Sequence, residues 1–408
     1  MTSSRVCMRI DNNIVDVTSL LKWHPGGSHC LESNKDNDVT DLFHTLHSNI
    51  SYEKYIVRKV DKENQRTAPA YVQEFRQLNE WMSKSGWYKS SPVYFFQHMF
   101  IISTLFITGI YLALRGNIEA GAFFIGIFWQ NSAGLGHDLG HSSVFKTRNM
   151  NHHVGSLLMA FTGLSTIWWR HSHFQHHIHT NILEQDPDIM HLPIFAITEK
   201  LFKSRFHKFL QIHTGMSTAS RYFVTIQHMT MYPLLFVARF NLYAQSMIHI
   251  FQNFRNRSFY WIETIGMLFF VIWYSLLALY VKDTIRFVLI SHITSGLLHL
   301  QIVISHWASE TYEEKYVKDT STNHYMHTLN TTIDVDCHEY MDWLHLGLQF
   351  QTVHHMFPRL PRHRLRQATE MVSLICKKYN LPYKKASFYE ANMILIKNMH
   401  NVANNIPI

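Results

Sequence analysis

Four long apolar stretches that contain no Asp, Glu, Lys or Arg dominate the pattern of this chain. They cover residues 90–114, 120–137, 264–281 and 287–309. A helix of about 20 residues crosses the hydrocarbon core of a bilayer, so each stretch predicts a transmembrane helix. Only residues 115–119 separate the first two and only 282–286 the last two, which predicts two helical hairpins. Burial in a large soluble core would explain one such stretch, but four in two tight pairs favour a membrane protein.

The basic residues predict how the hairpins are oriented. The two short loops hold only Arg115, Lys282 and Arg286, whereas residues 138–260 hold eleven Lys and Arg residues. Because positive residues are retained in the cytosol, we expect that segment and both termini there. The apolar stretch at 154–169 is only 16 residues long and predicts one interfacial or half-buried helix instead of a fifth span.

The composition agrees with a membrane protein and excludes several other classes. Of 408 residues, 47% are apolar and 16% are charged, against about 25% charged in typical soluble domains, which excludes a disordered chain. The net charge of +8 suits contact with anionic lipid. No nucleic-acid partner is expected, because the basic residues lie close to the predicted membrane boundaries. The four cysteines form no CxxC pair, which argues against a disulfide framework, and Arg5 and Arg9 interrupt any signal peptide.

Three histidine groups lie where the predicted spans meet the cytosol, in a chain with 30 histidines. Their spacing of three and four residues places the members of a group on one face of a helix. Neutral imidazole is a ligand for iron, zinc or copper, and seven imidazoles can hold more than one ion. The groups are HDLGH with His137 and His141, HFQHH with His173, His176 and His177, and QTVHH with Gln351, His354 and His355.

Two other kinds of metal site are disfavoured by the sequence. A zinc protease needs HExxH, and the HE pair His338 and Glu339 is followed by Tyr-Met-Asp. A ferritin-like di-iron site uses Glu-x-x-His pairs, which the sequence lacks. We therefore expect a metal site built mainly from imidazole.

A separate histidine pair near the amino end predicts a haem site. The sequence His24-Pro25-Gly26-Gly27 follows an apolar stretch, and His47 comes 23 residues after His24. Glycines let the backbone approach a flat ligand closely, and two neutral histidines on opposing helices can bind a haem iron axially. His44 competes with His47 as the second ligand, although the spacing favours His47.

These segments together resemble the cytochrome b5-fused front-end desaturases, which act on acyl chains or, in some members, on the long-chain base of sphingolipids. Residues 1–60 resemble a cytochrome b5 domain, and roughly 92–368 resemble a membrane fatty acid desaturase. Gln351 is the feature that separates the front-end group from other desaturases with three histidine boxes. The most specific segments are HPGG, HDLGH with the preceding Gly134, WWRHSHFQHHIHTN, DPDI and LGLQFQTVHHMFPRLPRHRL.

The resemblance implies a di-iron centre held by the seven histidines of the three groups, with Gln351 at or beside the iron. In this family a further histidine from the last span completes the site, for which His306 fits best and His299 is the weaker candidate. The resemblance also implies a b-type haem held by His24 and His47.

Three residues near the histidine groups have expected outer roles. His171 and His179 flank the second group and are expected outside the ligand set. Asp138 is a candidate to accept a hydrogen bond from a ligand imidazole.

The implied fold is an α-helical integral membrane protein with four transmembrane helices and a cytosolic histidine cap, preceded by a small α+β domain. The expected divisions are a cytochrome b5-like domain at 1–60, a linker and interfacial segment at 61–91 with its polar part at 61–70, a desaturase domain at 92–375 and a cytosolic tail at 376–408.

The implied activity is an O2-dependent oxidation that places a double bond in a fatty acyl or sphingoid chain at the endoplasmic reticulum membrane. NADH-cytochrome b5 reductase would supply the electrons. The acidic Glu32, Asp36, Asp38 and Asp41 suit docking of the haem end on that reductase or on the basic segment 359–366 of the chain itself. Two alternatives stay open: a b5-fused lipid hydroxylase with the same di-iron centre, and a non-catalytic membrane haem protein that only passes electrons.

Overall fold

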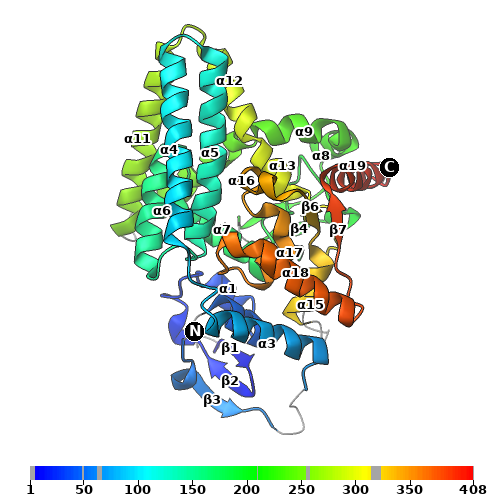
Figure 1. Ribbon diagram of the computed structural model, residues 1–408. Coiled ribbons are helices and arrows are strands. Elements are labelled where there is room, and N and C mark those ends of the chain that lie inside the picture. The colour runs from blue at the N-terminus through cyan, green and yellow to red at the C-terminus, as the bar shows by residue number, and fades with distance from the viewer. Residues whose placement is uncertain are drawn as a thin grey trace.

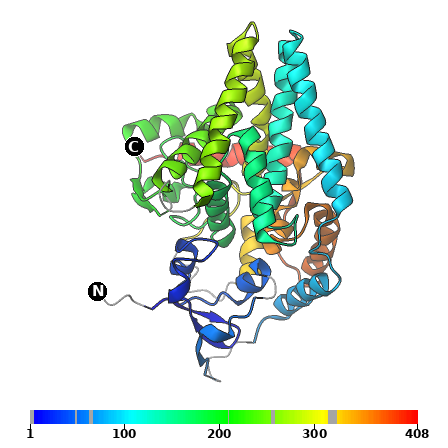
Figure 2. The ribbon, with the colours of Figure 1, turned by 90° about the vertical axis from the view of Figure 1, so that its left-hand side faces the viewer.

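The computed structural model describes residues 5–47, 50–61, 67–208, 210–253, 258–313 and 323–407. A small amino-terminal domain lies at one end, a bundle of long helices at the other, and a layer of shorter helices and strands between them (Figures 1 and 2). Part of the predicted linker, residues 62–66, lies outside the described residues.

The amino-terminal domain is a three-stranded antiparallel sheet covered by short helices. Strand β1 (Cys7–Ile10) pairs with β2 (Asn13–Asp16), which pairs with β3 (Ile56–Lys59). Met8 and Ile10 alternate into the core, as in any half-buried strand. The predicted small α+β domain is thus confirmed. Between β2 and β3 the chain forms η1 (Thr18–Leu20), α1 (His29–Glu32), α2 (Thr40–Leu46) and η2 (Glu53–Tyr55).

The long helices form the two predicted hairpins. The first consists of α4 (Pro92–Leu114) and α5 (Ile118–Gly140), and the second of α11 (Ser258–Tyr280) with α12 (Thr284–Ser295) and its continuation α13 (Leu297–Val303). Among the described residues, three helices are long and apolar enough to cross a membrane: Pro92–Leu114, Trp261–Tyr280 and Thr284–Val303. A bent pair, α9 (Gln227–Val237) with α10 (Arg239–Asn253), meets the same criteria if it is taken as one span with a 62° bend.

Helix α5 has the length of a span but is the most buried helix of the bundle, where it packs against both α4 and α12 (Figure 1). Its buried interior includes Gln130 and Asn131, which explains why its composition alone does not mark it as a span. A Cβ on Gly121 would lie 2.7 Å from the backbone nitrogen of Ala113 in α4, and one on Gly126 would lie 2.6 Å from the carbonyl oxygen of Ser291 in α12. These two glycines therefore permit the close packing of α5 on both sides.

The stretch at 154–169 is divided between two helices, α6 (Arg148–Thr162) and α7 (Thr166–Ile178). Gly163 ends α6 with a φ of 74°, in the left-handed region. The Ser165 hydroxyl then accepts a hydrogen bond from the Trp168 N–H at 3.0 Å and caps α7. The prediction of one helix here is wrong, because hydropathy does not register the turn at Gly163.

The intermediate layer carries the third histidine group, on α17. It contains α15 (His324–Thr331), α16 (Asp342–His345), η6 (Leu348–Phe350), α17 (Gln351–Met356), α18 (Arg362–Lys378), the parallel pair β6 (Asp334–Asp336) and β7 (Lys385–Ser387), and α19 (Phe388–Asn404). Helix α19 buries Leu395 and Met399 against α9 and α13. Helix α3 (Ala70–Lys84) packs on α18. The other elements are η4 (Glu199–Phe202), β4 (Arg205–His207), β5 (Ile212–Thr214), α8 (Thr218–Thr225) and η5 (Glu339–Met341).

Candidate functional site

Five histidines from three helices converge where α5 ends. One ring nitrogen from each lies within 4.8 Å of the others. Metal–imidazole bonds of about 2 Å separate the ligands of one ion by roughly 3–4 Å, so this group has the dimensions of a single metal site. We call it the five-histidine cluster; it consists of His137 of α5, His141 directly after α5, His173 and His177 of α7, and His354 of α17.

A second group lies beside the first. His176, His306 and His355 also place ring nitrogens within 4.8 Å of one another, and we call them the three-histidine cluster. The rings of His177 and His355 are stacked with their centroids 4.1 Å apart, so the two clusters touch. All seven predicted histidines are therefore brought together with His306. His299 is buried but belongs to neither cluster.

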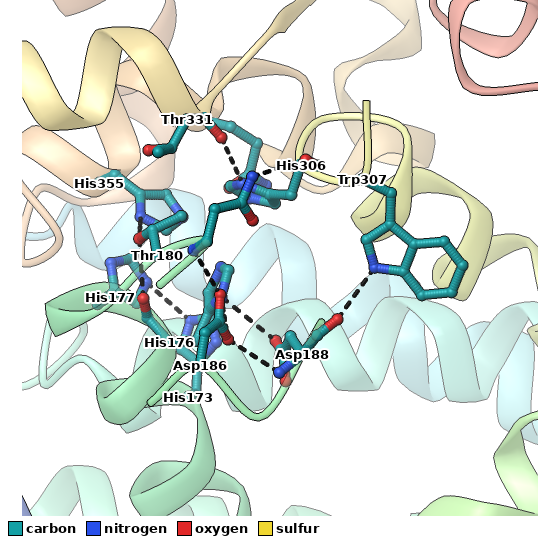
Figure 3. A network of polar contacts seen from close by, with 12 residues as sticks. His173, His176, His177, Thr180, Asp186, Asp188, His306, Trp307, Thr331 and His355 are labelled. Atoms are coloured by element: carbon teal, nitrogen blue, oxygen red, sulfur yellow. Dashed lines mark hydrogen bonds and ion pairs between the residues drawn. The ribbon is translucent and has the colours of Figure 1, made fainter. Parts of the chain in front are cut away.

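The ring orientations in the three-histidine cluster are fixed by hydrogen bonds (Figure 3). His176 Nδ1 donates to the Asp186 carboxylate at 3.0 Å, and His306 Nδ1 donates to the carbonyl oxygen of Thr331 at 3.1 Å. Thr180 gives its own hydroxyl hydrogen to the His176 carbonyl, so His355 Nδ1 donates to Thr180 Oγ1, at 3.0 Å. With each Nδ1 carrying a hydrogen, Nε2 of each ring is the atom available to a metal.

Asp186, in the DPDI segment, contacts the three-histidine cluster through His176, a contact that the sequence did not predict. It is fully buried and also accepts the backbone N–H groups of Asn181 and Asp188, each at 2.8 Å. Burial alone would lower the pKa of His176, but the charges of Asp186 and Asp188 outweigh burial and raise that pKa to about 9. The carboxylate thus both orients His176 and increases its basicity.

The five-histidine cluster contains buried ring nitrogens that have no hydrogen-bond partner among the described residues. They are both nitrogens of His141, Nδ1 of His177 and Nε2 of His354. Burial, followed by the neighbouring imidazoles, holds the pKa values of His173, His177 and His354 well below the usual range, so these rings are neutral. Buried polar atoms are nearly always paired, and a bound metal would account for these exceptions.

Gln351 lies beside the three-histidine cluster. It is the first residue of α17 and is buried, with Oε1 3.4 Å from Nε2 of His306. The start of α17 is anchored by Asp334, whose carboxylate accepts the Thr352 N–H at 2.8 Å. The amide of Gln351 is therefore held next to Nε2 of His306, the nitrogen that is available to a metal.

Asp138 has a different partner from the predicted one. Its carboxylate forms a buried ion pair with Arg362 of α18 at 2.7 Å, whereas Nδ1 of His137 is 3.6 Å away, beyond hydrogen-bond distance. Asp138 thus holds α18 against α5. His171 and His179 lie outside both clusters, as predicted: the His171 ring packs near His249, and His179 faces the amino-terminal domain.

The amino-terminal domain brings the rings of His24 and His47 together, with centroids 6.0 Å apart and planes tilted by 55°. Two metal–nitrogen bonds of about 2 Å plus the ring radii fill this separation, so the pair fits one iron between the rings. His47 Nδ1 donates to the Phe43 carbonyl at 3.0 Å, which leaves its Nε2 free. His44 instead contacts Asp11 at 3.1 Å on the exposed side. The geometry therefore favours His47 over His44, and the residues present fit a haem.

The amino-terminal domain lies against the intermediate layer (Figure 2). Ser33, in the turn after α1, contacts His179 Nε2 at 2.8 Å through its hydroxyl. Arg359 Nε donates to the carbonyl oxygen of Thr45 at 3.1 Å. Each contact thus joins a segment close to His24 or His47 to a segment that follows one of the histidine groups.

The predicted docking of acidic residues on the segment 359–366 is not what the structure contains. Asp41 pairs with Arg76 of α3 at 2.6 Å, and Asp38 pairs with Arg9 inside its own domain at 3.2 Å. A backbone carbonyl, that of Thr45, is what Arg359 binds. The charge pattern could not distinguish Arg9 and Arg76 from the arginines of the segment 359–366 as partners of these carboxylates.

Comparisons with known proteins identify both parts of the chain. Residues 118–387 match the fatty acid desaturase family, and residues 2–62 match the cytochrome b5-like heme/steroid binding domain.

Relatives match nearly the whole chain. An acyl-lipid (9-3)-desaturase of Borago officinalis is 34% identical over 97% of this chain and 89% of its own length. A Delta(8)-fatty-acid desaturase of Helianthus annuus is 33% identical over 96% and 86%. A Delta 8-(E)-sphingolipid desaturase of Komagataella phaffii is 33% identical over 86% and 66%.

These matches have direct consequences for the cofactors and the class of protein. The desaturase family is membrane-bound and implies iron, and the cytochrome b5-like domain implies haem and electron transfer. The relatives are desaturases, so neither the hydroxylase nor the non-catalytic electron carrier is favoured. The chain belongs to the fatty acid desaturase family and is a membrane oxidoreductase of the front-end type, fused to an amino-terminal cytochrome b5-like domain.

Proposed function

We propose that the chain inserts a double bond into a fatty acyl or sphingoid chain, with O2 as co-substrate and NADH-cytochrome b5 reductase as electron donor. Two electrons and two protons, together with the two hydrogens removed from the chain, reduce O2 to two water molecules. The observation that carries the proposal is the contact of two imidazole clusters at the end of an apolar helical bundle, with the His24–His47 pair in a domain that packs beside them.

The two clusters are the proposed binding sites of two iron ions. One ion is assigned to the five-histidine cluster and the other to the three-histidine cluster, where the Gln351 amide oxygen is a further neutral donor. Iron held there would supply the activation of O2 and the removal of hydrogen from two adjacent methylenes. His306 is preferred to His299 as the additional ligand, because it lies in a cluster.

The surrounding residues have the task of presenting these nitrogens. Asp186, the Thr331 carbonyl and Thr180 each receive an Nδ1 hydrogen, so three Nε2 atoms point into the cluster without further rearrangement. The Asp138–Arg362 pair holds α18 against the end of α5. A small cavity lined in part by His137, His141 and His354 adjoins the five-histidine cluster and has room for about one water-sized molecule.

Electrons are proposed to enter through the amino-terminal domain, where His24 and His47 would hold haem. Ser33 and Thr45 fasten this domain to segments that follow the second and third histidine groups. Such a tether keeps the haem domain at high effective concentration at its acceptor.

The substrate is proposed to enter from the endoplasmic reticulum membrane, with both termini in the cytosol. The clusters lie where α5 leaves the bundle and meets the intermediate layer (Figure 1). A lipid chain inserted between the helices would then have its headgroup near this layer, which is proposed to face the cytosol. The relatives are named acyl-lipid (9-3)-desaturase, Delta(8)-fatty-acid desaturase and Delta 8-(E)-sphingolipid desaturase, and the proposed substrate belongs to the acyl-lipid, fatty acid or sphingolipid classes.

Lipid analysis of a host that lacks such activity tests this proposal. The host expresses the full chain, is fed several polyunsaturated acids, and its fatty acids and sphingoid bases are compared with those of a host expressing His176→Ala. A new double bond that depends on His176 is the expected result. A hydroxylated product would favour the lipid hydroxylase over the desaturase. A purified protein that contains haem but no non-haem iron would favour the non-catalytic electron carrier.

A further inference from the structure

We propose that Glu263 of the transmembrane helix α11 positions the second histidine group, because its carboxylate binds the first turn of α7. The inference rests on the proposed binding of iron by the two histidine clusters. Glu263 is the single charged residue of α11, lies near the proposed cytosolic end of that helix, and is 6% exposed. A carboxylate in a membrane helix is costly unless it is bonded, so its presence there indicates a specific role.

The carboxylate accepts hydrogen bonds from the start of α7. The first N–H groups of any α-helix have no carbonyl oxygen of their own helix to bind. The Ile167 N–H donates to Oε1 of Glu263 at 2.9 Å, and the Thr166 N–H is a further donor to this carboxylate. The Ser165 hydroxyl accepts the Trp168 N–H, so its own hydrogen is directed to Oε2 of Glu263. A side chain 96 residues further along the chain than Ile167 thus completes the cap of α7.

The same face of α11 packs against the turn that leads into α7. Gly266 and Phe270 follow Glu263 by three and seven residues, a spacing that places all three on one side of the helix. A Cβ on Gly163, in the turn between α6 and α7, would overlap the Phe270 ring. A Cβ on Gly266 would lie 3.3 Å from Cβ of Ala160 in α6, and the two helices lie side by side (Figure 1). The start of α7 is therefore fixed to α11 by close packing and by the carboxylate.

The negative charge of Glu263 suits this place. The amino-terminal end of a helix carries a partial positive charge, which a carboxylate stabilises. Arg170, about one turn further along α7, is buried, and its Nε has no hydrogen-bond partner among the described residues. The charge of Arg170 acts on Glu263 as an attraction. One carboxylate thus compensates both the helix end and a buried cation of the same helix.

A displacement of the start of α7 would reach both clusters. His173 and His177 belong to the five-histidine cluster and His176 to the three-histidine cluster, so α7 supplies nitrogens to each. The first of them lies about two turns after the cap, and a helix transmits a shift of its first turn along its axis because its hydrogen bonds keep it rigid. Glu263 contacts no proposed ligand and acts through α7, so its role is that of a positioning residue.

Iron retention by the purified full-length protein tests the proposal. The release of non-haem iron to a chelator is timed, and haem absorbance gives the amount of protein. Glu263→Ala removes both acceptor oxygens and should release iron roughly fivefold faster, the factor that the loss of a helix cap corresponds to. Glu263→Gln keeps the size of the side chain and one acceptor oxygen, so its rate should lie between those of the wild type and the alanine variant.

Two comparisons separate positioning from a general loosening of the bundle. Glu119→Ala is the matched control, because it removes a glutamate and its 2.8 Å ion pair with Arg286 at the far end of α5. Its iron release should equal that of the wild type. Ser165→Ala removes the same bond from the other side, so combining it with Glu263→Ala should accelerate release by less than the product of the two single effects.

The outcomes are distinct from those that test the proposed function. The graded order of the two Glu263 variants, with an unaffected Glu119 control, supports the proposal. Wild-type rates in the Glu263 variants, equal acceleration by Glu119→Ala, or a fully multiplicative double variant overturn it. Where the alanine variant yields no protein, the glutamine variant decides alone, and a wild-type rate there overturns the proposal. Absence of non-haem iron from the wild-type protein would instead overturn the proposed function.

Discussion

Arg359 Nε donates a hydrogen bond to the carbonyl oxygen of Thr45 at 3.1 Å, and its guanidinium lies over the ring of Tyr88 at 4.8 Å. Thr45 belongs to α2, which ends just before His47, and Arg359 follows α17, which carries His354 and His355. One side chain thus connects the helix of a proposed haem ligand to the helix of two proposed iron ligands.

Replacement of Arg359 should therefore impair electron delivery. A hydrogen bond from a charged group contributes about 1.5–3 kcal/mol, which corresponds to roughly tenfold or more in the population of the docked domain. Arg359→Ala should slow product formation and the reoxidation of reduced haem, while haem and iron contents stay at wild-type levels. Arg364→Ala, which removes a partly exposed arginine of α18 that contacts Gln367 and Trp87, is the control. Equal reoxidation rates in both variants and the wild type would exclude this role.

The second prediction concerns Asp186. Asp186→Asn keeps the size of the side chain but removes the charge that orients His176, and loss of such a partner typically weakens metal binding about 10–100-fold. Iron per protein, measured by elemental analysis, should fall while the protein remains in the membrane. Asp188→Asn is the comparison, because that carboxylate is 3.7 Å from His176 and should matter less. Full iron content in the Asp186 variant would contradict the assignment.

Single replacements within the clusters should abolish the product. His137→Ala, His176→Ala and His355→Ala each remove one nitrogen from a group in which several must act together. The lipid product should fall to background without loss of protein from the membrane fraction. His171→Ala, outside both clusters, should retain activity. Wild-type-like product from any of the first three would remove that histidine from the site.

Gln351 offers a graded test of the three-histidine cluster. Its amide oxygen is 3.4 Å from His306 Nε2, so a change there acts directly on the metal-facing atoms. Gln351→Ala should lose most activity, Gln351→His should retain part of it because imidazole is a good ligand, and Gln351→Glu should be poorer than the histidine variant because it adds a negative charge. Near-normal turnover by the alanine variant would place Gln351 outside the chemistry.

Haem binding should depend on His24 and His47 but not on His44. His24→Ala and His47→Ala each remove one ring of this pair, so the low-spin absorbance should disappear. His44→Ala loses only its contact with Asp11 and should keep the spectrum. The reverse pattern for His44 and His47 would show that the second ligand is misassigned.

The sequence is sufficient for the features that depend on local spacing. The hairpins follow from uninterrupted apolar stretches, and the ligand faces follow from histidines three and four residues apart, as in His173, His176 and His177. The exclusion of HExxH and Glu-x-x-His sites left imidazole as the principal ligand, and the structure brings these imidazoles together.

Features that depend on chain reversal could not be read from spacing. Asp186 lies ten residues after His176 and reaches it only because the chain turns back after α7. Gly163 divides a stretch that hydropathy treats as continuous. The partners of Asp38, Asp41 and Asp138 are all arginines, and only tertiary packing decides which arginine each one meets.

The glycine contacts of α5 bear on any attempt to re-engineer this enzyme. The helix that delivers His137 and His141 is wedged against α4 at Gly121 and against α12 at Gly126. A larger side chain at either position would displace the neighbouring backbone and carry the attached imidazoles with it. Libraries aimed at new substrate preferences should therefore leave this helix unchanged and vary the walls contributed by other helices, away from Glu263, where a change of shape is not transmitted to the metal ligands.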